Sequence, residues 1–243
     1  MKSFFKFLFA SILGVILGLL LFFFIMMGIV GSMVSSGDKV VKVKPNSVLL
    51  VKLDQTIVDR SSDNPFDNFN FNFFEADPKI GLNDVLEGIK KAKTDENIKG
   101  ILLQAEAFPS GFATVEEIRN ALVDFKTSGK FLYAYGDYFT QKSYYLNSVA
   151  DKIYITPEGG MELKGLSTEL MFFKGTLEKL GLEPIIIRHG KFKSAVEPFM
   201  YDKMSPENRE QISAFIGSFW KHNVAGVIFS RPMELVDINR ISD

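Results

Sequence analysis

The distribution of apolar residues divides the chain into an N-terminal stretch without charge and a longer part. In the longer part, segments with the hydrophobic pattern of strands alternate with segments that have the hydrophobic period of helices. No charged residue occurs from residue 7 to residue 37. About 20 apolar residues cross the hydrocarbon core of a bilayer, whereas a cleaved signal peptide has an apolar region of roughly 7 to 15. The pattern therefore predicts a retained membrane anchor over residues 1–37. The alternative is an overlong signal peptide that is cut near Gly31 or Ser36.

The charges that flank this stretch leave its orientation open. Lys2 and Lys6 precede it, and Lys39, Lys42 and Lys44 follow it. Topology follows the difference in Lys and Arg between the two flanks, and here the two sides are nearly balanced.

Beyond residue 37, short β-branched runs alternate with segments of helical period. Residues 47–53 (SVLLVKL) follow a Pro45-Asn46 turn signal and predict a buried strand. Thr114 and Glu117 have the spacing of a capping box, and Gly129 is placed to end the helix that follows. Further strands are predicted at residues 98–103, 131–135, 152–156 and 184–188, a turn at 157–160, and helices at 82–89, 114–125, 140–149, 174–180 and from Ser205-Pro206 onward.

This repeat of strand then helix determines the fold class. Units of roughly 30 residues predict right-handed βαβ crossovers and a mainly parallel sheet. We therefore expect an α/β fold behind one N-terminal transmembrane helix. We divide the chain into the anchor at 1–37, a first strand with a Phe/Asn-rich loop at 38–80, and the main domain at 81–243.

The Phe/Asn-rich loop is unusual in composition. Residues 63–77 (DNPFDNFNFNFFEAD) place five Phe among Asn and Asp. A mobile loop is one interpretation. The other is a flap that packs against a neighbouring subunit or the membrane surface, because exposed aromatic patches usually contact something.

Composition and charge exclude several function classes. The 243 residues include no Cys, which excludes disulfides, thiolate metal sites and a cysteine nucleophile. The net charge of −1 and the absence of a dense basic face argue against nucleic acid as a partner. His189 and His222 belong to no metal-binding motif and no nucleotide fingerprint occurs, so we expect neither metal nor cofactor.

Candidate chemistry lies in residues 184–206 (PIIIRHGKFKSAVEPFMYDKMSP), where Lys191, Lys193 and Ser194 follow a predicted strand. A lysine amine acts as a general base only when burial or a neighbouring cation lowers its proton affinity, and Arg188 is close enough in sequence to contribute. From these residues alone, a solvated surface loop remains the alternative.

The segment GKFKSAVEPFMYDKMSPENREQI closely resembles the lysine-bearing segment of the long form of signal peptide peptidase A, or protease IV, a peptidase family S49 group of the ClpP/crotonase superfamily. The anchor, SVLLVKLDQTIVD, IKGILLQ and YAYGDYFTQKSYYLNSVADKIYITPEGG also follow that family's order. Lys193 matches the general base, which takes a proton from a serine and returns it to the leaving amine. For Ser194 we expect only a supporting hydrogen bond, because in an extended segment it would point away from Lys193.

The resemblance also implies a membrane-anchored serine endopeptidase that degrades cleaved signal peptides or other membrane-associated peptides. It implies a single pass through the inner membrane, an extracytoplasmic (periplasmic) main domain, and a homo-oligomer, with a tetramer as the family's arrangement.

The chain departs from the family at the nucleophile. In long-form members, the first half supplies the lysine and the second half supplies a serine in a small-residue turn. Here the corresponding turn places Gln141 at the nucleophile's position, and Ser143 lacks the neighbouring glycines. Residues 232–243 begin a helix and then stop. This predicts that the chain is a truncated form of a longer product. We expect this chain alone to be inactive.

Two alternatives remain. One is a catalytically silent ClpP-like module that oligomerises or binds membrane substrates. The other is a crotonase-type acyl-CoA enzyme, which shares the fold class but gives no reason for an anchor or for the KSAVEPF segment.

Overall fold

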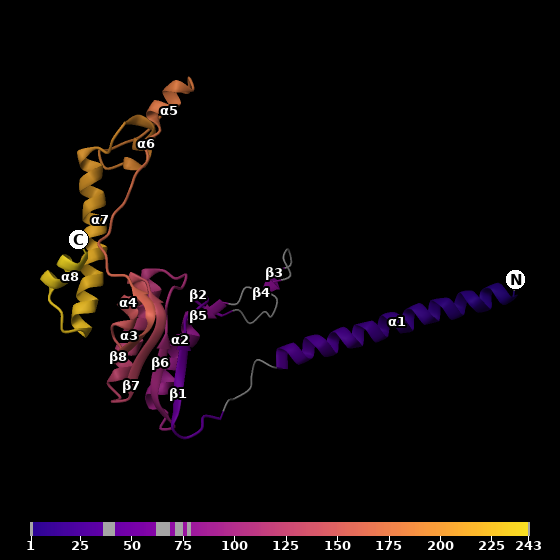
Figure 1. Ribbon diagram of the computed structural model, residues 1–243. Coiled ribbons are helices and arrows are strands. Elements are labelled where there is room, and N and C mark those ends of the chain that lie inside the picture. Colours follow the sequence, from indigo (N-terminus) through magenta and orange to yellow (C-terminus); the bar gives the residue numbers. More distant parts are fainter. Residues whose placement is uncertain (1, 36–41, 62–68, 71–74, 77–78, 243) are drawn as a thin grey trace.

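The structure is a computed structural model that describes residues 2–35, 42–61, 69–70, 75–76 and 79–242. In Figure 1 the chain runs from the long indigo helix α1 to the yellow C-terminal helices. Most of the Phe/Asn-rich loop lies outside the described residues, so the structure does not bear on the flap hypothesis.

The N-terminal apolar stretch forms one continuous helix, α1 (Lys2–Ser35). Within it, Ser3–Gly28 is long and apolar enough to cross a membrane by length and composition. A signal sequence near the N-terminus meets the same criterion, so the helix agrees with both interpretations of this stretch.

The main sheet has four strands in the order β1-β6-β7-β8, and every neighbouring pair is parallel. This confirms the predicted α/β class and parallel sheet. β1 pairs with β6 and so belongs to the same sheet as the later strands, although it precedes residue 81. The division of the chain at residue 80 stays a prediction. The strands of this sheet are β1 (Ser47–Lys52), β6 (Ile98–Gln104), β7 (Phe131–Phe139) and β8 (Lys152–Met161).

Three helices cover one face of this sheet, because each connection between parallel strands must cross back over it. They are α2 (Leu82–Thr94), α3 (Phe112–Lys126) and α4 (Gln141–Asn147). The core between sheet and helices is closed by fully buried side chains, among them Ile101, Leu103, Leu132, Ile118 and Leu122. Burying a side chain of this size contributes about 1.5–3 kcal/mol, so this layer supplies much of the stability.

The described residues also form two small two-stranded sheets. β2 (Thr56–Val58) and β5 (Lys79–Gly81) are parallel, whereas β3 (Phe69–Asn70) and β4 (Glu75–Ala76) are antiparallel.

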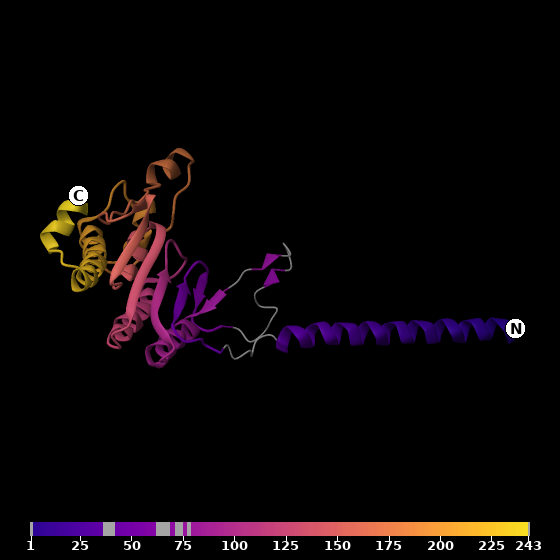
Figure 2. The same ribbon diagram turned by 60° about the horizontal axis from the view of Figure 1, so that its bottom comes forward.

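After β8 the chain leaves the body and returns along a long helix. We call residues 162–205 the arm; it contains α5 (Lys174–Lys179), a single 3₁₀ turn η1 (Ser194–Val196) and α6 (Glu197–Met200). The return helix is α7 (Pro206–Ser230), and α8 (Leu235–Ser242) follows it. Figures 1 and 2 both show the arm projecting beyond the sheet and α7 leading back to it.

The sequence predicted a strand at residues 184–188, and this is wrong. No described strand pairs with the segment, and Ile185 and Ile187 are 92% and 94% exposed. The β-branched run has the composition of a strand, but a strand also needs a neighbour to receive its backbone hydrogen bonds.

Two local predictions also need correction. The α3 helix begins two residues before Thr114, with Gly111 as its N-cap, so the predicted capping box does not form. The predicted turn at residues 157–160 is part of β8, which stays paired to β7 through a register shift between Gly136 and Tyr138. Pro157 is tolerated there because β8 is an edge strand. Gly129 does end α3, with a φ of 75° that favours glycine.

Arg119 on α3 joins α7 to the body. Its guanidinium group is buried and donates to Tyr145 O (2.6 Å), Ser148 Oγ (2.9 Å) and Ser230 Oγ (2.7 Å), and also to Gly226 O. It lies 4.6 Å from the centroid of the Tyr145 ring. Burial lowers the pKa of the guanidinium group, which nevertheless stays charged because an arginine is protonated throughout the accessible pH range.

We expect Arg119→Met to lower the free energy of unfolding by about 3 kcal/mol, because the change leaves several buried acceptors without a donor. Urea denaturation of the chain in mild detergent measures the change. The exposed Arg209→Met on α7 is the matched control, with an expected change within about 0.5 kcal/mol. Equal changes in the free energy of unfolding for the two substitutions would contradict the stabilising role of Arg119 between α3 and α7.

Candidate functional site

Lys193 lies on the arm immediately before η1, where the chain turns toward α7. It borders an open hollow of about 610 Å³ that is also lined by Arg188, His189 and Gln211. Its side chain is exposed, and within the described part of the chain its amine has no hydrogen-bond or ion-pair partner. This chain alone therefore does not form the dry pocket that a lysine base needs, and the general-base role of Lys193 stays a prediction.

Ser194 does not occupy an extended segment as the sequence predicted. It is the first residue of the 3₁₀ turn η1, and it lines both the hollow beside Lys193 and a second, apolar hollow. The local cause is the sequence that follows, since Glu197 and Pro198 open α6 and Pro favours the first turn of a helix. The supporting role of Ser194 stays a prediction.

The second hollow has a volume of about 380 Å³ and lies between the arm and α7. Leu170 and Pro198 line it from the arm, and Asn208, Ile212 and Phe215 line it from α7. Asn208 is buried, and its Oδ1 atom has no hydrogen-bond partner. The hollow therefore offers an apolar wall beside the Lys193 turn.

Glu197 fixes the Lys193 turn to the start of α7. The carboxylate is fully buried and accepts hydrogen bonds from Ser205 Oγ (2.6 Å) and Asn208 Nδ2 (2.8 Å). Arg188 Nη1 lies 3.7 Å from Glu197 Oε1. Ser205 in turn caps α7 by accepting from the Asn208 backbone N–H (3.1 Å), which confirms the predicted helix start at Ser205-Pro206.

The charge of Glu197 is retained in spite of its burial. Burial by itself would raise the pKa of this carboxyl group, but the hydrogen bonds from Ser205 and Asn208 and the nearby Arg188 together lower it. Glu197 is not among the site residues that the sequence predicted. A carboxylate just before a proline in an otherwise apolar segment, eight residues ahead of a Ser-Pro helix start, is the signal that was available.

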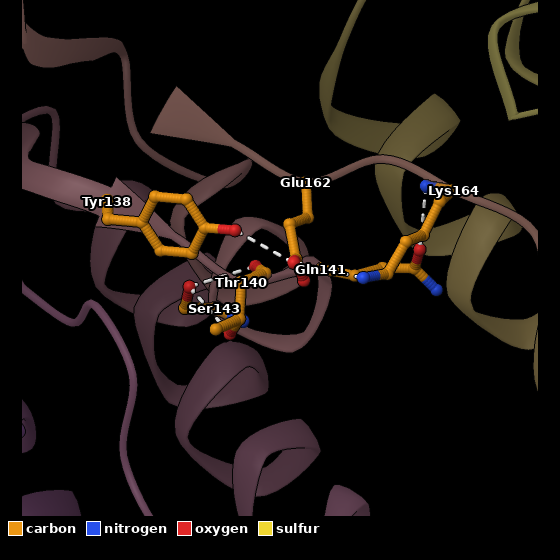
Figure 3. A network of polar contacts seen from close by, with 6 residues as sticks. All are labelled: Tyr138, Thr140, Gln141, Ser143, Glu162 and Lys164. Carbon is orange, nitrogen blue, oxygen red and sulfur yellow. Dashed lines mark hydrogen bonds and ion pairs between the residues drawn. The ribbon is translucent and has the colours of Figure 1, made fainter. Parts of the chain in front are cut away.

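The position that the resemblance assigns to the nucleophile makes a structural contact. Gln141 is the first residue of α4, and its Oε1 atom accepts a hydrogen bond from the backbone N–H of Lys164 (3.0 Å) at the base of the arm. Beside it, Glu162 Oε1 accepts from Tyr138 Oη (2.8 Å) and from Lys164 Nζ (3.0 Å). Figure 3 shows these side chains gathered where β8 passes into the arm.

Ser143 is not placed to act as a nucleophile. It is fully buried, its Oγ donates to Thr140 O (2.9 Å), and its backbone N–H donates to the Thr140 side chain (3.2 Å), as Figure 3 shows. These contacts form the N-cap of α4. The neighbouring Lys142 donates to Phe108 O (3.0 Å) and Ser110 O (2.7 Å), and burial lowers the pKa of its amine.

The two histidines lie apart from one another. His189 is on the arm beside Lys193, whereas His222 is on α7 with its Nε2 atom 3.2 Å from Glu116 Oε1. Among the residues that the structure describes, no group of three or more His, Cys, Asp or Glu side chains could hold a metal ion.

The Gln141 contact generates an expectation for hydrogen exchange. In Gln141→Ala, the Lys164 amide loses its acceptor, so we expect it to exchange about tenfold faster, the equivalent of one hydrogen bond. Amide exchange measured by NMR checks this. Gln211→Ala, an exposed glutamine on α7, should leave the Lys164 rate unchanged. An unaltered rate in Gln141→Ala would show that the contact does not hold the base of the arm.

The buried carboxylate of Glu197 should make the stability of the fold depend on pH. The pKa of Glu197 is below its ordinary value of 4.5 in the folded chain, so its ionised form stabilises the fold above that pH. This stabilisation is lost as the pH falls through the lowered folded pKa. We expect Glu197→Gln to cost about 1–3 kcal/mol at neutral pH and progressively less in acid.

Denaturant titrations of both chains from pH 7 down to pH 3 measure this difference. Glu210→Gln, at an exposed position of α7, is the control and should show almost no difference at any pH. A constant gap between Glu197→Gln and the unmodified chain across the whole range would rule out the ionised state as the source of stability.

Comparison with known proteins relates this site to proteases. The model of Peptidase family S49 matches residues 124–243, which include α4, Lys193 and Glu197. Protease 4 from Salmonella typhi is 39% identical over 63% of this chain, and Protease 4 from Haemophilus influenzae is 38% identical over 64%. Serine protease SPPA, chloroplastic, from Arabidopsis thaliana is 33% identical over 61% of the chain.

The chain spans about a quarter of the length of these curated relatives, with 25%, 26% and 22% of each covered. The family is ClpP-like, which agrees with the α/β architecture and its parallel sheet. These matches confirm the resemblance that the KSAVEPF segment indicated: the chain carries a Peptidase family S49 domain at residues 124–243 and is similar to proteins named Protease 4 and SPPA.

Proposed function

We propose that this chain supplies the general-base half of a membrane-anchored serine endopeptidase with a Ser-Lys dyad, which degrades cleaved signal peptides. One observation carries the proposal. Lys193 begins the KSAVEPF segment beside an open hollow, and buried Glu197 holds that segment on α7, in a chain related to proteins named Protease 4.

In the proposed reaction, the uncharged amine of Lys193 removes the proton from a serine hydroxyl as its oxygen attacks the peptide carbonyl. The amine then returns that proton to the leaving nitrogen. The serine belongs to further polypeptide that packs over the hollow, because Gln141 and Ser143 are both engaged in structural contacts. The same packing would bury Lys193 and, together with the Arg188 charge nearby, favour its neutral form.

The lining of the apolar hollow favours a substrate with apolar side chains. Its walls of Leu170, Ile212 and Phe215 suit an aliphatic or aromatic side chain. Peptides of that composition partition into membranes. An enzyme that α1 holds in the inner membrane, with its main domain in the periplasm, would meet them at high local concentration.

Assembly with other polypeptide is part of the proposal. The arm exposes Ile185 and Ile187 almost completely, together with Met171 and Leu182, and isolated soluble surfaces seldom carry such a patch. A homo-oligomer, with a tetramer as the family's arrangement, would cover the patch and bring the arm to a neighbouring domain.

A second candidate function is a catalytically silent ClpP-like module that binds peptides or partner proteins. The observation that favours it is the engaged side chain of Gln141 at the position of the nucleophile.

A fluorophosphonate probe, which labels activated serines, separates the two candidates. We expect no labelling of this chain and clear labelling of the product extended downstream in its gene. Lys193→Ala should reduce labelling of the extended product by about 10³-fold or more, because the general base of such a unit is indispensable.

Lys191→Ala is the matched control, since it removes an exposed amine from the same turn and should retain nearly all labelling. Full labelling of the Lys193→Ala product would refute the proposed base. If the extended product is not labelled at all, the silent module is the better account.

A further inference from the structure

The face of the main sheet opposite the helices is exposed. The register pairs Leu50 with Leu102, Leu102 with Tyr133, and Tyr135 with Tyr154, and because side chains alternate along each strand these residues share one face. We call this surface the tyrosine face. It consists of Val48, Leu50, Leu102, Phe131, Tyr133, Tyr135 and Tyr154.

The tyrosine face is partly exposed, and its aromatic rings contact one another. Val48, Leu50, Tyr135 and Tyr154 are between 40% and 52% exposed. The ring of Tyr133 lies 4.8 Å from that of Phe131 and 6.0 Å from that of Tyr154, measured between centroids. Gly100 leaves room for the Phe131 ring, since a Cβ atom there would lie only 2.5 Å from it. The rings therefore hold one another in a continuous layer.

Such a surface is incomplete by the usual rule for parallel sheets. Parallel sheets are almost always covered on both faces, because their crossover connections lie on them. Here the described helices α2, α3 and α4 cover only the opposite face, where Ile101, Leu103, Leu132 and Ala134 are buried. A contiguous apolar patch of this kind marks a contact surface.

The lysines at one edge of the tyrosine face indicate what covers this face. Lys42 and Lys44 precede β1, and Lys152 begins β8 with its amine 5.8 Å from the centroid of the Tyr133 ring. Because β1 and β8 lie in the same parallel sheet, these lysines are at the edge formed by the amino ends of the strands. Tyr rings and lysines at one surface are the combination that suits a membrane interface with anionic headgroups.

The position of the anchor provides the second argument. Only residues 36–46 separate α1 from β1. A chain of that length reaches at most about 40 Å when fully extended, so β1 cannot move far from the bilayer surface once α1 is inserted.

We propose that the tyrosine face rests on the surface of the bilayer that α1 crosses, with Lys42, Lys44 and Lys152 on anionic phospholipid headgroups. This inference rests on the proposed membrane anchoring. It holds the α/β body against the lipid and leaves the arm directed away from the sheet, where it is free to meet other polypeptide.

The absence of cysteine from the sequence makes a direct test possible. Single variants Leu50→Cys and Tyr154→Cys carry an environment-sensitive NBD fluorophore on the tyrosine face, and Asn120→Cys carries it on an exposed position of α3 on the opposite side. The full chain is placed in nanodiscs of phosphatidylcholine with phosphatidylglycerol, one copy to each disc. Iodide quenching then reports exposure of the probe to water, and alkaline carbonate washing of matched vesicles reports anchoring.

We expect iodide quenching at positions 50 and 154 to fall about threefold in these nanodiscs relative to detergent micelles, with no change at position 120. Adding Lys44→Glu and Lys152→Glu, or omitting phosphatidylglycerol, should restore most of the quenching. Unchanged quenching at positions 50 and 154 in a chain that resists carbonate washing would overturn the lipid contact and leave the anchoring intact.

Shielding that appears in micelles and increases with protein concentration would overturn the proposal in favour of a second copy on this face. Shielding that persists after the Lys→Glu changes would overturn the role of anionic headgroups. Release of the chain by carbonate would refute the anchoring itself, and the lipid contact with it.

Discussion

The buried guanidinium group of Arg119 is the contact on which the rest of the architecture depends. It donates to carbonyl and hydroxyl groups of α4 and α7 from its position on α3, with no carboxylate among these partners. A buried charge is stable only while its hydrogen-bonding capacity is filled. The three helices are therefore held in one arrangement, and the position of α7 determines where the arm ends.

The arm is attached at two polar contacts, one at each end. At its base, Gln141 holds the Lys164 backbone, and at its return, Glu197 ties the Lys193 turn to Ser205 and Asn208. Between them the chain is largely exposed and apolar. The arm is thus fixed at both ends and unburied in the middle, and Lys193 lies on it. This arrangement explains why the candidate base is open to solvent in the single chain.

Much of the fold could be predicted from local pattern. The strands at 47–53, 98–103 and 131–135 and the helix start at Ser205-Pro206 follow from apolar runs and capping chemistry, which act over a few residues. Residues 184–188 have the same β-branched character, yet they form no strand, because strand pairing depends on a distant neighbour. Pro157 and the residues after it carry a turn signal, yet β7 holds them in an edge strand.

The sequence by itself determined the α/β class, the apolar N-terminal helix and, through the KSAVEPF segment, the peptidase family, because each is encoded in consecutive residues. Only the tertiary structure decided that Glu197 is buried as an ion, that Gln141 is engaged in holding the arm, and that no described helix covers the tyrosine face. These properties depend on groups that are distant in sequence and come together only when the chain folds. Burial and hydrogen bonding change the charge and accessibility of a side chain, and neither can be determined from the order of residues alone.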